Sequence, residues 1–168
     1  MTRLILLLVP ALMTLAACEP TTGGGTDGKP AARVYRISGA EASRVQFRML
    51  DSVNSLRNAA GQPPLAFDAQ LNAAAATHSR DMSVQNRPWH FGSDGSSPID
   101  RVQRVGYPRV LYGELISETY ETEVETLAAW LEDPASRTIL MDARATDMGF
   151  AWYQEPNGKI WWTLILGG

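Results

Sequence analysis

The sequence predicts an α+β domain, a three-layer α-β-α sandwich with a mainly antiparallel sheet. Amphipathic helical patterns occupy much of residues 40–132, where apolar residues recur every three or four positions. Two segments rich in aromatic and branched residues follow, 148–154 and 159–166, and Asn157-Gly158 between them is typical of a hairpin turn. Both faces of the second segment are apolar, which favours helices on both sides of the sheet. Alternation places Trp161, Thr163 and Ile165 on one face and Trp162, Leu164 and Leu166 on the other.

Four helices are expected before the hairpin. The first covers about residues 40–59, where Val45, Met49, Val53 and Leu56 recur at helical spacing before Gly61-Gln62-Pro63-Pro64 ends the pattern. The second is rich in alanine and follows Asp68, a residue suited to an N-cap. The third is short and ends at Gly106, and the fourth runs from Thr122 to Asp133-Pro134. Residues 133–141 are expected to form a turn or a short helix.

Residues 1–17 are expected to be a lipoprotein signal peptide. Arg3 precedes an apolar run at 4–15 that is too short to span a bilayer stably, and Leu15-Ala16-Ala17-Cys18 resembles the bacterial lipobox. We expect Cys18 to be acylated and to anchor the chain on a membrane, the outer one in a two-membrane bacterium; the alternative is an ordinary secretory signal with an incidental thiol. Residues 18–39 are then a glycine-rich tether, and 40–168 are the domain.

Charge and cysteine content limit the possible partners and the source of the domain's stability. The chain has 168 residues, a net charge of −3 and no basic patch, which argues against nucleic acid as a partner. Cys18 is the only cysteine, so the mature domain cannot form an internal disulfide and depends on its core for stability.

One loop, residues 89–98, combines His90 with two glycines and several small polar residues, a composition suited to tight turns and side-chain hydrogen bonds. His78 falls on the apolar face of the second helix, where a packed histidine with one ring nitrogen hydrogen-bonded is expected. Glu114 lies inside an apolar run, where a carboxylate is costly unless it is paired. It is therefore either a surface residue at a strand end or a deliberately placed carboxylate.

Several ordered motifs resemble a bacterial member of the CAP superfamily, the cysteine-rich secretory, antigen 5 and pathogenesis-related proteins, also called the SCP domain. The resemblance covers about residues 45–166. Its motifs are Asn54-Ser55-Leu56-Arg57, Gly61-Gln62-Pro63-Pro64-Leu65, His78-Ser79-Arg80-Asp81-Met82, the loop from His90 to Pro98, and Gly113-Glu114.

The resemblance implies an α-β-α sandwich with a surface cleft lined by two histidines and two acidic residues, which binds a divalent metal in some members. The first histidine falls on His90 and the first glutamate on Glu114. Ser136 stands where the second histidine is expected. Asp133 or Glu132 either takes the place of the second acidic residue or is a solvated residue at a helix end. Two further positions, Leu115 and Ile139, lack the family's asparagine.

Three functions remain open at this level. The first is a non-catalytic binding domain for a small apolar ligand, a lipid or an envelope component, with a cleft formed by His90, Glu114, Asp133 and Ser136. The second is a hydrolase that uses His90 and Glu114 as base and orienting group, with or without metal. The third is an envelope protein-interaction module with a vestigial cleft. No cofactor is expected, and His90 and Glu114 alone are weak candidates for a metal site, because zinc usually needs three or four protein ligands.

Overall fold

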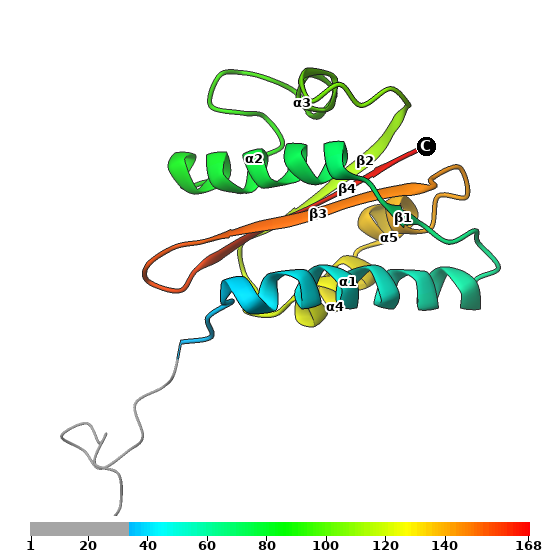
Figure 1. Ribbon diagram of the computed structural model, residues 1–168, viewed down its shortest axis with the longest axis horizontal. Helices are drawn as coiled ribbons and strands as arrows, with labels where there is room; N and C mark the ends of the chain where they lie inside the picture. Colours follow the sequence, from blue (N-terminus) through cyan, green and yellow to red (C-terminus); the bar gives the residue numbers. More distant parts are fainter. Residues whose placement is uncertain (1–33) are drawn as a thin grey trace, which may run out of the picture. The chain divides into compact units, whose positions relative to one another are not determined.

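The computed structural model describes residues 34–168 (Figure 1). The expected signal peptide, the lipidation site at Cys18 and the tether up to residue 33 lie outside the described residues. In chain order the elements are α1 (Gly39–Ala59), β1 (Ala66–Phe67), α2 (Ala69–Gln85), α3 (Pro98–Arg104), β2 (Leu111–Ser117), α4 (Glu123–Glu132), α5 (Pro134–Leu140), β3 (Asp147–Gln154) and β4 (Ile160–Gly167).

Residues just before α1 already take part in the fold. Tyr35 and Ile37 pack against the core, and the Ile37 N–H donates to Gln154 Oε1 at 3.0 Å. Tyr35 and Ile37, which were expected to belong to the tether, therefore contact the core of the domain.

The sheet is mixed and has the strand order β1-β3-β4-β2. β4 lies between β3 and β2 and pairs antiparallel with both, so the mainly antiparallel sheet is confirmed. β1 pairs in parallel with β3, with Ala66 opposite Asp147 and Phe67 opposite Met148. A strand of two residues is too short to show an alternating pattern, which is why the sequence did not indicate it.

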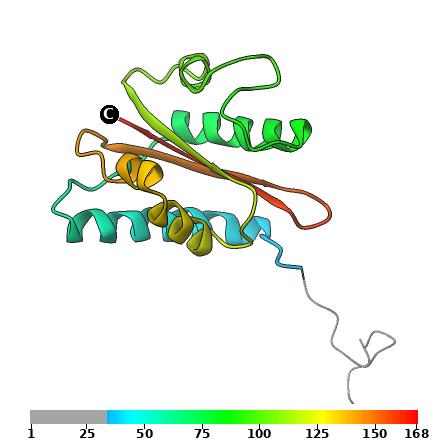
Figure 2. The ribbon, with the colours of Figure 1, turned by 180° about the vertical axis from the view of Figure 1, so that it is seen from behind.

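Helices cover both faces of the sheet, as predicted (Figures 1 and 2). α2 and α3 lie on one side, and α1, α4 and α5 lie on the other. There are five helices in the described chain rather than four, because residues 134–140 form a helix behind the N-cap Asp133. None of the helices within residues 34–168 is long and apolar enough to cross a membrane.

The two faces of β4 pack into different cores, as the alternation predicted. Trp162, Leu164 and Leu166 belong to the larger cluster, which includes residues of α1 and α4. Ile165, on the other face, packs with Leu71 and other residues of α2. Each strand position is thus buried whichever way it points, which explains why the segment is apolar throughout.

α2 lies close against β3 because small residues line the contact. A Cβ at Gly149 would lie 2.2 Å from the carbonyl carbon of Leu71, so only glycine permits this approach. Asp68 caps the helix as expected, its carboxylate accepting from the Leu71 N–H at 2.8 Å. The packing of α2 holds the fully buried His78, one turn after the buried Ala75, against the sheet.

Candidate functional site

The loop that carries His90 is fixed by its own small polar residues. The Gly92 N–H donates to the Ser96 carbonyl at 2.8 Å, and a Cβ at Gly92 would lie 2.6 Å from Ser96 Oγ. Gly95 has a φ of +77°, which favours glycine. Asp81 of α2 accepts from the Ser93 N–H at 2.7 Å and from Ser93 Oγ at 2.6 Å. The loop is therefore tied both to itself and to α2.

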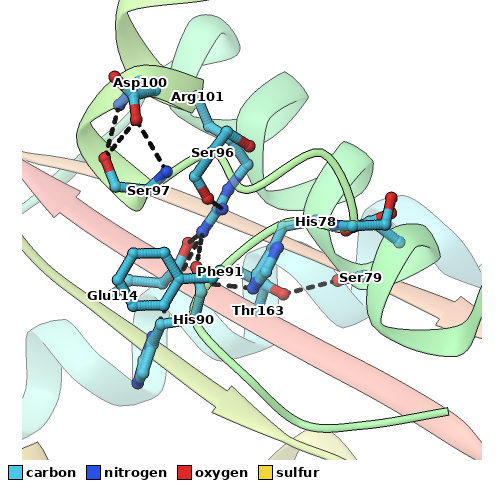
Figure 3. Close-up of polar contacts among 12 residues, drawn as sticks. His78, Ser79, His90, Phe91, Ser96, Ser97, Asp100, Arg101, Glu114 and Thr163 are labelled. Atoms are coloured by element: carbon cyan, nitrogen blue, oxygen red, sulfur yellow. Dashed lines mark hydrogen bonds and ion pairs between the residues drawn. The ribbon is translucent and has the colours of Figure 1, made fainter. Parts of the chain in front are cut away.

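Glu114 lies at the centre of the site and is buried on β2. Its Oε1 is 2.9 Å from His90 Nδ1, and Arg101 Nη2 donates to Oε1 at 2.8 Å and to Oε2 at 2.7 Å. His78 Nε2 lies 3.6 Å from Oε1. Figure 3 shows these three side chains around the carboxylate. Of the two interpretations of Glu114 drawn from the sequence, the buried, paired carboxylate is the one observed.

Opposing effects act on the pKa of Glu114. Burial raises it, but the hydrogen bond from His90 and the charge of Arg101 together outweigh burial and hold the pKa below its usual value. Glu114 is therefore ionised at neutral pH and can only accept hydrogen bonds. It follows that His90 Nδ1 carries the proton between them. In the neutral ring this leaves Nε2 as an acceptor, and Figure 3 shows this nitrogen pointing away from Glu114.

His78 is a buried neutral histidine. Burial lowers its pKa below the usual value, and the positive charge of Arg101 acts in the same direction, against the attraction of Glu114. Neither ring nitrogen has a hydrogen-bond partner within the described chain. The expectation that one nitrogen would be hydrogen-bonded is therefore wrong: at 3.6 Å the nearest carboxylate oxygen is beyond good hydrogen-bonding distance.

Arg101 joins the loop to the sheet. Besides Glu114, its guanidinium donates to the Ser96 carbonyl at 3.1 Å and to the His90 carbonyl at 2.9 Å. The side chain is buried, and its Nε has no partner within residues 34–168. Arg101 thus positions the backbone of His90 and neutralises Glu114 with one group.

A shallow groove opens beside His90. We call this the His90 groove; it has a volume of about 280 Å³ and is lined by His90, Ser97, Pro98, Ile99, Leu111, Tyr112, Gly113 and Glu114. A second hollow of about 220 Å³ shares Ile99 and Leu111 with it and continues along Val110. Most of the groove wall is apolar, and the half-exposed ring of His90 is its most accessible titratable group.

The donor set does not fit a divalent metal. Arg101 contacts both oxygens of Glu114, so a guanidinium charge lies where a metal would have to approach the carboxylate. The Nδ1 of His90 is engaged by the same carboxylate. A metal would have to displace both partners, and the described residues hold no group of three or more His, Cys, Asp or Glu side chains that could hold a metal ion.

The other two residues expected in the cleft pair with each other. Asp133 caps α5, accepting from the Ser136 N–H at 2.8 Å and from Ser136 Oγ at 2.6 Å. No hydrogen bond or ion pair of the described residues joins either of them to His90 or Glu114. The structure thus forms two separate pairs from the four expected cleft residues, His90 with Glu114 and Asp133 with Ser136.

Two residues of the site were not assigned to it from the sequence. His78 was placed on an apolar helix face, which is correct, but the contact with Glu114 depends on how α2 packs over β3 and β4. Arg101 follows the Ser97 N-cap by one turn, beside the buried Val102. The cost of burying Glu114 was a signal that a cation was needed, and Arg101 is the cation within reach.

The fold is an α-β-α sandwich in which a histidine and a glutamate are in contact beside a surface groove. The family model of the cysteine-rich secretory protein family, CAP, matches residues 50–166. The chain therefore belongs to the CAP family.

Relatives agree with this assignment. The uncharacterised protein YkwD of Bacillus subtilis (strain 168) is 25% identical over 128 residues, which cover 76% of this chain and 49% of that protein. The chain thus spans about half the length of this curated relative.

Solved structures share the fold. An outer surface protein of Borrelia burgdorferi matches with a TM-score of 0.69 at 15% identity, over 74% of this chain and 92% of that one. An extracellular protein containing an SCP domain, from Bacillus anthracis, matches with a TM-score of 0.68 at 24% identity, over 78% of this chain and 44% of that one. At these identities the similarity concerns the fold alone.

Proposed function

We propose that this chain is an extracytoplasmic CAP-domain lipoprotein that binds a small apolar or amphipathic ligand, such as a lipid or an envelope component, without catalysing a reaction. The ligand lies in the His90 groove. The observation that carries the proposal is the composition of that groove, whose largely apolar wall includes Pro98, Ile99 and Leu111 around one accessible imidazole. Ligand sites generally combine apolar walls with a few polar groups that fix orientation.

The polar groups of the groove favour binding over catalysis. Ser97, which with Tyr112 is one of two hydroxyl-bearing residues that line the groove, is committed to a capping box: it donates to Asp100 Oδ2 at 2.7 Å and accepts from the Asp100 N–H at 3.2 Å. Glu114 is neutralised by Arg101. His90 Nε2 then remains as a hydrogen-bond acceptor for the polar end of a ligand, for instance a hydroxyl or an amide N–H.

The proposed location depends on Cys18. The Leu15-Ala16-Ala17-Cys18 motif follows an apolar run, and the several acyl chains of a bacterial lipoprotein would hold the domain at a membrane. We expect Cys18→Ala to release the protein from the membrane fraction or to leave it unprocessed. A variant that stayed membrane-bound at the parent's mature mass would contradict lipidation at this residue.

Native mass spectrometry of the protein purified from the envelope of its own host tests the binding proposal. The parent should carry a small-molecule adduct. Ile99→Glu, which places a charge in the groove, should lose it, whereas Val124→Glu on α4 should keep it. The two side chains are equally exposed, at 56% and 57%, so Val124→Glu is a matched control. An adduct retained by Ile99→Glu would place the ligand elsewhere. Co-purification of a protein instead of a small molecule would favour the envelope interaction module.

One observation favours hydrolysis as a second candidate. His90 Nδ1 lies 2.9 Å from Glu114 Oε1, the arrangement of a general base with its orienting carboxylate. Arg101 opposes it, because a carboxylate already held by a guanidinium stabilises a protonated imidazole less. We expect hydrolysis of p-nitrophenyl esters to be unchanged in His90→Ala. A His90-dependent rate that survives chelation of metals would make the protein a hydrolase.

A further inference from the structure

Apolar side chains gather around the His90 groove. Trp89 and Phe91 flank His90 in the loop, and their rings contact each other with centroids 5.3 Å apart. Ile99 lines the groove, and Val110 lines the hollow that continues from it. These four side chains are 41–59% exposed. We call them the groove rim.

The groove rim is amphipathic. The Arg87 guanidinium lies 4.0 Å from the centroid of the Trp89 ring and makes no ion pair within residues 34–168. Figure 3 shows the Phe91 ring beside His90 and Glu114, at the outer side of the site. Exposed aromatic rings with an arginine over the face of one of them suit the boundary between lipid headgroups and acyl chains, where rings bury an apolar body and cations meet anionic headgroups.

The length of the chain before the domain allows this face to reach a bilayer. If Cys18 is the anchor, 16 residue steps separate it from Val34, a span of at most about 60 Å when fully extended. A domain of this size has a radius of gyration of about 14 Å. An anchor at Cys18 would therefore be far enough along the chain from Val34 for docking by the groove rim, and surface chemistry would decide which face docks.

We infer that the groove rim docks onto the bilayer to which the chain is tethered, with Trp89 and Phe91 in the headgroup region and the His90 groove opening toward the lipid. This inference rests on the proposed function and extends it: the ligand is a membrane amphiphile that enters the groove from the bilayer without crossing water. The lipid anchor supplies proximity, and the groove rim supplies orientation.

Vesicle binding by the chain from residue 18 onward, with Cys18→Ser to remove the anchor, tests the inference. The vesicles contain phosphatidylethanolamine and phosphatidylglycerol. Trp89→Ser/Phe91→Ser should weaken sedimentation with these vesicles by about tenfold or more, because it removes two half-exposed rings from the contact. The matched control is Phe47→Ser/Val124→Ser, which removes two exposed apolar side chains from α1 and α4 on the opposite side of the sheet (Figure 2). It should bind as the parent does.

Quenching by brominated acyl chains gives a second readout that does not depend on affinity. Trp130, Trp161 and Trp162 are buried and Trp152 is half-buried, so the quenched fluorescence should come from Trp89 and disappear in Trp89→Phe. Absence of vesicle binding by the parent, or equal loss in both double variants, would overturn docking. So would a self-association of the parent that the rim variant abolishes, since a second copy would then be the occupant.

The outcomes for docking and for ligand binding are separable. If the parent retains a ligand in native mass spectrometry but does not bind vesicles, docking is wrong and the proposed function stands. If vesicle binding depends on the groove rim while no small-molecule ligand is ever found, docking stands and the proposed function is wrong.

Discussion

Breaking the pair between Arg101 and Glu114 is predicted to destabilise the domain strongly. The two side chains are 5% and 2% exposed, and removing either one leaves the other as a buried charge without its main partner. Loss of one partner of a buried pair typically costs about 3–5 kcal/mol. For a domain of this size, that corresponds to a fall in the melting temperature of roughly 10–20 °C.

A double-mutant cycle separates the pair from the cost of altering each side chain. Glu114→Gln and Arg101→Met should each lose about 3–5 kcal/mol in urea unfolding, whereas the double variant should lose clearly less than the sum, because neither charge then remains buried. Asp94→Asn is the control. Asp94 and Arg104 form an exposed pair, and Asp94 also accepts from the Ser96 N–H at 2.9 Å, so its substitution should change stability far less than breaking the buried pair does.

Two results would refute this reasoning. Additive losses in the double variant would mean that the two charges do not act on each other. Unchanged stability in Glu114→Gln would mean that the carboxylate is not needed to balance Arg101. The Arg101→Met variant should also lose the fixed position of the loop, visible as faster amide hydrogen exchange at Gly92 and Ser96, because its bonds to the His90 and Ser96 carbonyls are gone.

Further predictions concern the pH dependence of stability, the core residue Trp130 and zinc binding. Stability should fall as the pH drops below about 6.5, because the pKa of His78 is lower in the folded chain than in the unfolded chain, which therefore takes up a proton first. The charged and titratable groups around this ring are Glu114, Arg101, Asp81 and His90. His78→Asn should flatten this part of a plot of stability against pH. Below about pH 4.5 the lowered pKa of Glu114 should add a further loss. Trp130→Ala should cost about 3–5 kcal/mol by calorimetry, because the ring is buried and its Nε1 donates to the Ile116 carbonyl at 3.1 Å; an unchanged melting temperature would contradict this. In titration calorimetry, zinc should bind no more tightly than about micromolar, roughly −8 kcal/mol, and Ser136→His should not tighten it while Arg101 holds Glu114; a clear gain would show that residue 136 faces the cleft.

The fold could be predicted because its elements are long enough to show their periods. α1 and the β3–β4 hairpin carry repeated apolar positions, and local turn chemistry marks their ends. The two departures are both short. β1 has two residues, and α5 has seven and depends on its cap, Asp133. Segments of this length acquire their structure from neighbours rather than from a repeating pattern.

The site could be predicted only in part, because its contacts join elements that are distant in sequence. The need for a partner to Glu114 could be predicted from the sequence, because a carboxylate inside an apolar run is costly to bury unless it is paired. Which cation meets that need depends on how α3 lies over β2, and α3 is only seven residues long. The neutral state of His78 depends similarly on the close packing of α2, which Gly149 permits. The position of His78 on an apolar helix face indicated that it is buried, but not that it lies beside Glu114.

Arg101 also accounts physically for the departures at the cleft. A carboxylate as buried as Glu114 needs a positive partner, and either a metal held by further ligands or a side-chain cation can provide it. Here the guanidinium provides it and at the same time binds the carbonyls of Ser96 and His90. The loop and the charge of the site are therefore stabilised together, without ligands at positions 133 and 136. Asp133 and Ser136 are then free to cap α5. Under the proposed function, His90 Nε2 remains available to accept a hydrogen bond from a ligand in the groove.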